Sequence, residues 1–84
     1  MHPQKLNGFH VIASAPRKGN IDGALIVLVF RPTNPMPYVV ATWAPHMGSE
    51  WCWGHYFSTF EDATTDYFSM CDWTDANNFK QRIA

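Results

Sequence analysis

The stretch Ala24-Leu25-Ile26-Val27-Leu28-Val29-Phe30 is an unbroken run of apolar residues. A strand with one face in water alternates apolar and polar residues, whereas this run is apolar on both faces. Its seven residues are far fewer than the about 20 that a membrane-spanning helix needs. The pattern therefore predicts a strand covered on both sides, which is either a central strand or one whose outer face meets another chain.

Three further strands are predicted around this run. They are 9–15, 38–43 and 51–57. Segment 38–43 is rich in the β-branched and aromatic residues that favour strands, and the prolines of 32–37 punctuate an irregular loop before it. In 51–57 a period of two places one set of side chains on a common face. This set is Trp51, Trp53, His55 and Phe57.

An amphipathic helix is predicted after the last strand. Ser58 can cap it, with Glu61 three residues on in the arrangement of a capping box. One side of the helix is mostly apolar and consists of Phe60, Ala63, Thr64, Tyr67, Phe68 and Cys71. The other side is polar and consists of Glu61, Asp62, Thr65, Asp66, Ser69 and Asp72. Thr74-Asp75 can start a short terminal helix.

The predicted fold class is α+β. A four-stranded antiparallel sheet carries one main C-terminal amphipathic helix on one face, because that arrangement buries the apolar sides of both. The 84 residues form a single domain, 1–84. Its four Trp, six Phe and three Tyr supply large core side chains for so short a chain.

The first eight residues have no apolar stretch that could serve as the core of a signal peptide. Without a secretion signal, Cys52 and Cys71 are expected to stay reduced, and the expected location is the cytoplasm.

Charge is distributed unevenly along the chain. No Lys or Arg lies between Arg31 and Lys80, while six of the seven acidic residues lie within 50–75. The predicted helix therefore has an acidic face, formed by Glu61, Asp62, Asp66 and Asp72. Such a face attracts basic partners and repels nucleic acid. The alternative is a merely solvated helix face without a binding role.

The chemistry-bearing residues do not assemble into a recognisable catalytic or metal motif. Cys52 and His55 lie three apart on a predicted strand, so their side chains point to opposite faces. Neither a C-x₂-C nor an H-x₃-H pair accompanies them, so no metal and no cofactor are expected. A nucleophile pair of Cys52 or Cys71 with His46 or His55 is the one enzymatic constellation available, and no local signature supports it. A non-enzymatic binding protein is the favoured function, with a protein partner bound through the acidic helix face or through the apolar face of the sheet.

The aromatic residues of the predicted hairpin offer an alternative function. A platform for single-stranded nucleic acid would be interleaved with Lys and Arg, which this region lacks. Some of these residues can instead line an apolar pocket between sheet and helix. The pocket would use Trp43, Trp51, Trp53 and His55. A small-molecule-binding or enzymatic domain with a pocket near Trp53 and His55 is therefore the alternative.

Three segments resemble a hairpin–helix module. They are Pro37-Tyr38-Val39-Val40-Ala41-Thr42-Trp43, Trp53-Gly54-His55-Tyr56-Phe57 and Phe60-Glu61-Asp62-Ala63. The module is similar to that of small uncharacterised proteins carried by mobile elements, namely phages, plasmids and integron gene cassettes. The resemblance covers roughly residues 37–72. It implies accessory cargo that modulates a host protein or counters a defence system, and it brings no catalytic residues.

Self-association is the last expectation. A single main helix can cover only one face of the sheet, so the face carrying Leu25, Val27 and Val29 is predicted to be exposed and to pair with a second copy. The competing arrangement has the N-terminal residues and the 32–37 loop fold over that face.

Overall fold

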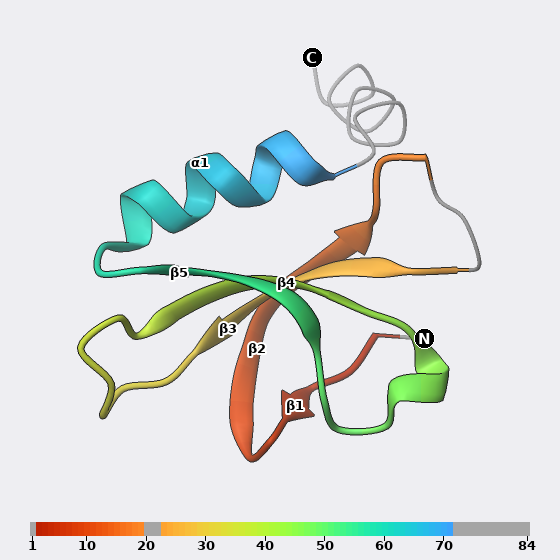
Figure 1. Ribbon diagram of the computed structural model, residues 1–84, viewed down its shortest axis with the longest axis horizontal. Coiled ribbons are helices and arrows are strands. Elements are labelled where there is room, and N and C mark those ends of the chain that lie inside the picture. The colour runs from red at the N-terminus through yellow and green to blue at the C-terminus, as the bar shows by residue number, and fades with distance from the viewer. Residues whose placement is uncertain (1, 20–22, 72–84) are drawn as a thin grey trace.

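The computed structural model describes residues 2–19 and 23–71. Its sheet is an antiparallel meander in which each strand pairs with its neighbour in sequence (Figure 1). The elements are β1 (Lys5–Leu6), β2 (Phe9–Pro16), β3 (Leu25–Phe30), β4 (Tyr38–Trp43), the 3₁₀ turn η1 (Pro45–Met47), β5 (Cys52–Phe57) and α1 (Phe60–Met70). The α+β class is confirmed, but the sheet has five strands rather than four. The terminal helix expected at Thr74-Asp75 lies outside the described residues.

The additional strand is β1, which the Asn7-Gly8 turn joins to β2. Both turn residues have positive φ, 52° at Asn7 and 81° at Gly8. Two-residue hairpin turns need such angles, and Asn-Gly is the pair that adopts them most readily. The backbone N–H of Asn7 also donates to the carbonyl of Ser49 at 2.8 Å. The N-terminal hairpin is thereby tied to the loop that precedes β5.

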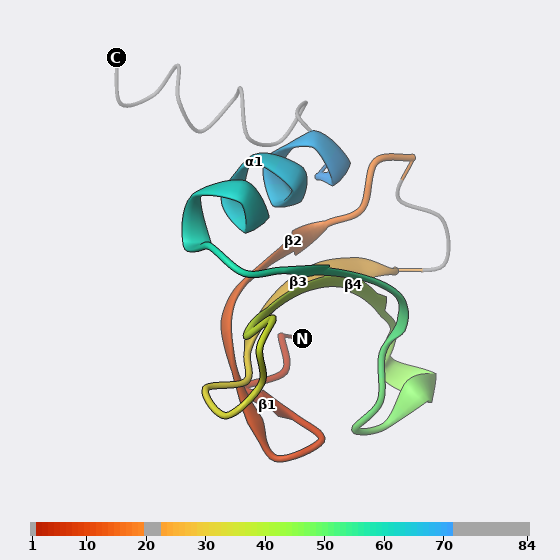
Figure 2. The same ribbon diagram turned by 60° about the vertical axis from the view of Figure 1, so that its left-hand side comes forward.

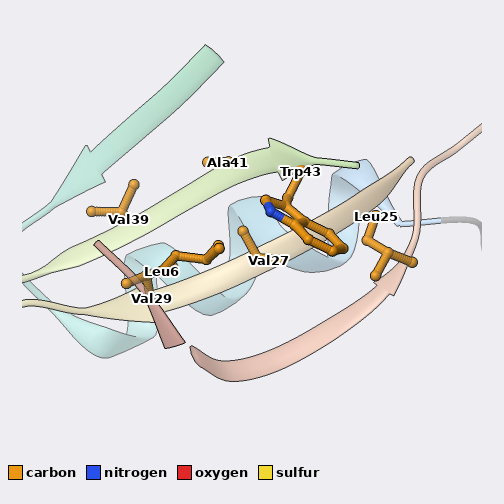
Figure 3. Close-up of a cluster of buried hydrophobic side chains, with 7 residues drawn as sticks. All are labelled: Leu6, Leu25, Val27, Val29, Val39, Ala41 and Trp43. Carbon is orange, nitrogen blue, oxygen red and sulfur yellow. The ribbon is translucent and has the colours of Figure 1, made fainter. Parts of the chain in front are cut away.

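The central strands β3 and β4 are buried on both faces. The apolar run predicted this for β3. Seven buried side chains form a cluster on the face turned away from α1 (Figure 3). The cluster consists of Leu6, Leu25, Val27, Val29, Val39, Ala41 and Trp43. A second cluster joins the opposite face to the helix and consists of Ile26, Leu28, Val40, Ala63, Tyr67 and Cys71.

A bulge interrupts the pairing of each strand that flanks this central pair. In β2 the register shifts between Val11 and Ala13, and between β4 and β5 it shifts opposite Val40 and Thr42. Each bulge changes which face the following side chains occupy. The first half of β2 therefore packs Phe9 and Val11 on the cluster away from the helix, and the second half packs Ala13 and Ala15 on the helix side. Bulges also bend a strand and increase its twist.

The sheet consequently curls into an arch, with α1 on the convex side and the N-terminal hairpin and η1 at its two ends (Figure 2). Leu6 lies inside the arch and is buried with Val27 and Val29. The prediction that Leu25, Val27 and Val29 are exposed is therefore wrong, because strands and turns of the same chain cover them. The N-terminal residues do fold over this face, as the competing arrangement had it, whereas the 32–37 loop contributes nothing to the cluster.

The helix begins after Thr59, whose hydroxyl accepts the Asp62 backbone N–H at 3.2 Å. The cap is thus Thr59 and not the predicted Ser58. Ala63 and Tyr67 are the buried residues of α1, and Cys71 follows it against the sheet. Within residues 2–19 and 23–71, no helix is long and apolar enough to cross a membrane.

Candidate functional site

The first turn of α1 presents two carboxylates to solvent. Glu61 and Asp62 are exposed, and neither forms an ion pair with any described residue. Acidic side chains at a helix N-terminus interact favourably with the helix dipole, so both residues stabilise α1 as well as charging its surface. These two residues form the exposed part of the predicted acidic face.

Asp66 lies differently from the other acidic residues of the helix. Its Oδ2 is 2.8 Å from Nδ1 of His55, and the pair joins α1 to β5. The Asp66 side chain is largely buried, while the imidazole is half-exposed. Asp66 therefore anchors the helix to the last strand and adds little to the exposed acidic face. Asp72 lies outside the described residues.

Two aromatic side chains lie exposed on the same helix. Phe60 is 50% and Phe68 45% exposed, although the helical pattern placed both on the apolar side. Phe60 meets the ring of Tyr38 edge-on at 5.5 Å between centroids, and Phe68 meets that of Tyr67 in the same way and at the same distance. Both rings are therefore held in place while one side of each faces water. We call Phe60, Glu61, Asp62 and Phe68 the α1 surface.

The structure does not gather the four residues of the predicted aromatic pocket. Trp43 is buried inside the arch, where its Nε1 donates to the carbonyl of Gly48 at 2.9 Å, and Trp51 packs beside this cluster. His55 lies on the helix side with Asp66. The bulge at Trp53 and Gly54 is the physical reason, because it breaks the period of two on which the common face depended.

Trp53 is the most exposed of the large apolar side chains among the described residues, at 67%. Its backbone is left-handed, with φ of 53°, which is uncommon for a bulky residue. The Arg17 guanidinium lies 5.3 Å from the centroid of the indole, within range of a cation–π interaction. Trp53 also lines a surface pocket together with Arg17 and Thr42. The sequence carried no signal that Arg17 or Thr42 would join it.

The described residues do not complete a catalytic or metal site. His55 and Asp66 form two members of a triad, but no described hydroxyl or thiol is hydrogen-bonded to His55. Cys71 is buried, and burial raises the pKa of its thiol, which disfavours the reactive thiolate. Cys52 is partly exposed, and both cysteines are free thiols. No group of three His, Cys, Asp or Glu side chains in the described part of the chain could hold a metal ion.

Comparison of the chain with known protein families, with curated proteins and with solved structures gives no match.

Proposed function

We propose that this chain is a non-enzymatic binding protein that docks a basic segment of a partner protein on the α1 surface. The observation that carries the proposal is the pairing on one helix of two exposed aromatic rings with two carboxylates that lack an ion-pair partner among the described residues. Aromatic side chains provide most of the energy of many interfaces, and charged groups around them select the partner.

The charge distribution defines the chemistry of this partner. No Lys or Arg lies between Arg31 and Lys80, so Glu61 and Asp62 have no cation nearby in sequence to neutralise them. A partner with Lys or Arg beside an apolar side chain would pair with the carboxylates while covering Phe60 or Phe68. The same negative field disfavours nucleic acid, whose binding remains unexpected for this chain.

The apolar face of the sheet, the other surface expected to bind a partner, is not accessible for docking. Val27 and Val29 are fully buried inside the arch, so a partner could not reach them without unfolding the sheet. A role as accessory cargo that modulates a host protein is compatible with docking through the α1 surface, and it is part of the same proposal.

Capture from native host lysate tests the proposal when charge and aromatic variants are compared as baits. The baits are the wild-type chain, Glu61→Lys, Phe68→Ala and Glu50→Lys. Glu50→Lys makes the same charge change on an exposed residue of the η1–β5 loop, away from α1. Each bait is first checked for an unchanged circular dichroism spectrum. Bound proteins are then quantified by mass spectrometry.

We expect a basic partner that the wild-type and Glu50→Lys chains retain. Glu61→Lys and Phe68→Ala should bind it at least about tenfold more weakly, because one reverses a docking charge and the other removes an anchor ring. Equal retention by all four baits would place the interface elsewhere. A captured partner without a basic segment would contradict the proposed chemistry.

A further inference from the structure

A second candidate site lies near the C-terminal end of α1, where β2 and β4 end and β3 and β5 begin (Figure 1). Residues next to or within these strand ends line a pocket of about 230 Å³. Its lining includes Arg17, Thr42, His46, Met47, Cys52 and Trp53. Pockets for drug-sized ligands usually measure about 300–1,000 Å³, so this one suits a smaller molecule.

The charged group of this pocket is Arg17, and none of the described residues that line it is acidic. The backbone around Arg17 is fixed, since its N–H donates to the carbonyl of Ala24 at 3.1 Å and the Lys18 N–H donates to that of Met70 at 3.0 Å. Arg17 forms no ion pair with a described residue. Its planar guanidinium can therefore present a pair of N–H donors to a ligand carboxylate.

Thr42 supplies an independent observation. The side chain is 2% exposed, and its Oγ1 has no hydrogen-bond partner among the described residues. Buried hydroxyl groups are nearly always hydrogen-bonded, so an orphaned one in the lining of a pocket indicates a missing partner. Oγ1 itself is covered, so a ligand, or a water that bridges the hydroxyl to the ligand, would satisfy it after a small shift of the pocket lining.

Trp53 supplies the third observation. A left-handed backbone is costly for a bulky side chain, and such strain is found preferentially at functional sites. Here it coincides with a broadly exposed indole beside the only cation that lines the pocket within the described residues. The indole face gives a planar apolar ligand a surface on which to stack.

We propose that this pocket binds a small planar carboxylate. The carboxylate pairs with Arg17, the planar part lies against the Trp53 ring and the apolar wall at Met47, and the Thr42 hydroxyl gains a partner. This site is independent of the α1 surface, and its ligand differs in charge from the basic segment proposed there.

Titration of the ¹⁵N-labelled chain with benzoate tests the proposal by nuclear magnetic resonance. The indole N–H signal of Trp53 is assigned by its loss in Trp53→Phe. We expect benzoate to shift this signal with a Kd on the order of 1 mM, as suits so small a ligand. Benzamide has the same shape without the charge, and it should bind at least about tenfold more weakly.

Variants of the pocket locate the binding. Arg17→Met should weaken benzoate binding at least about tenfold, and the near-isosteric Thr42→Val should weaken it about threefold or more. Lys5→Met removes a charge from exposed β1 and should leave the Kd unchanged. Equal shifts with benzoate and benzamide would overturn the proposal, and so would equal losses in Arg17→Met and Lys5→Met. If Arg17→Met fails to fold, the benzamide comparison and Thr42→Val decide.

Discussion

At the scale of single residues, the backbone of Trp53 decides where the side chains of β5 point. Its φ of 53° accompanies the bulge that separates Trp51, on the inside of the arch, from Phe57, on the helix side. Sequence reasoning could not foresee this, because tryptophan has no preference for positive φ. The Asn7-Gly8 turn was foreseeable, since this pair is the strongest short hairpin signal, and β1 was missed because it has only two residues.

Replacement of Trp53 by glycine or alanine tests the left-handed backbone. Both changes remove the ring, but only glycine adopts positive φ without a steric penalty. We expect Trp53→Gly to be more stable than Trp53→Ala by about 1 kcal/mol in urea unfolding. His10 of β2 has ordinary strand geometry and serves as the control position. There the order should reverse, and His10→Gly should be less stable than His10→Ala by about 0.5–1 kcal/mol. The same order at both positions would refute the left-handed assignment.

At the scale of elements, the strands were largely predictable and the orientation of α1 was not. Segment 38–43 coincides with β4, and the apolar run contains β3. The helix was expected with Phe60 and Phe68 facing the sheet, whereas it contacts the sheet mainly through Ala63 and Tyr67. Helical spacing defines an apolar arc but not which part of that arc a curved sheet covers.

The cap of α1 gives a direct test of where the helix begins. Thr59→Ala removes the hydroxyl that accepts the Asp62 N–H, so it should lower the free energy of unfolding by about 1 kcal/mol. Ser58→Ala is the matched control, because no hydrogen bond joins the Ser58 side chain to a described residue. Thermal unfolding of both variants and the wild-type chain measures the difference, and the effect of Ser58→Ala should be near zero. A larger loss of unfolding free energy in Ser58→Ala than in Thr59→Ala would show that Ser58 caps the helix, as the sequence predicted.

The buried side of α1 predicts a stability that depends on alkaline pH. Burial raises the pKa of the Tyr67 phenol above its ordinary value of 10.0, and that of the Cys71 thiol above 9.0. The folded chain therefore holds both protons more tightly than the unfolded chain. This contribution is complete only well below pH 9, where both groups stay protonated even when unfolded, and it is lost as pH rises through and above the ordinary pKa values of the thiol and the phenol.

Urea unfolding from neutral pH to about pH 10.5 measures this dependence. Tyr67→Phe should flatten the alkaline loss of stability, because phenylalanine has no proton to release. Tyr56→Phe changes an exposed tyrosine and serves as the control. An identical alkaline slope in the wild-type and Tyr67→Phe chains would contradict the buried placement of the phenol.

At the scale of the whole molecule, the chain covers both faces of its own sheet. The apolar run predicted a strand covered on both sides but left open whether the second cover was the same chain. In the structure the same chain provides the second cover, because the sheet curls over its own inner face. The curl involves two bulges and the hydrogen bond between Asn7 and Ser49. These are long-range features that a linear pattern does not encode. Pairing with a second copy stays a prediction, and it would require a surface other than Val27 and its neighbours.

The substitution Val27→Asp tests the arch most directly. Val27 is fully buried in the cluster away from the helix, so an unpaired carboxylate there should cost several kcal/mol, a large part of the roughly 5–15 kcal/mol that stabilises a typical domain. Ile12→Asp, at the exposed bulge of β2, is the control and should stay folded. Near-UV circular dichroism and sedimentation equilibrium are measured on both. The arch predicts an unfolded Val27→Asp chain, whereas a folded Val27→Asp protein of lower mass than the wild type would show that this face is an interface between copies.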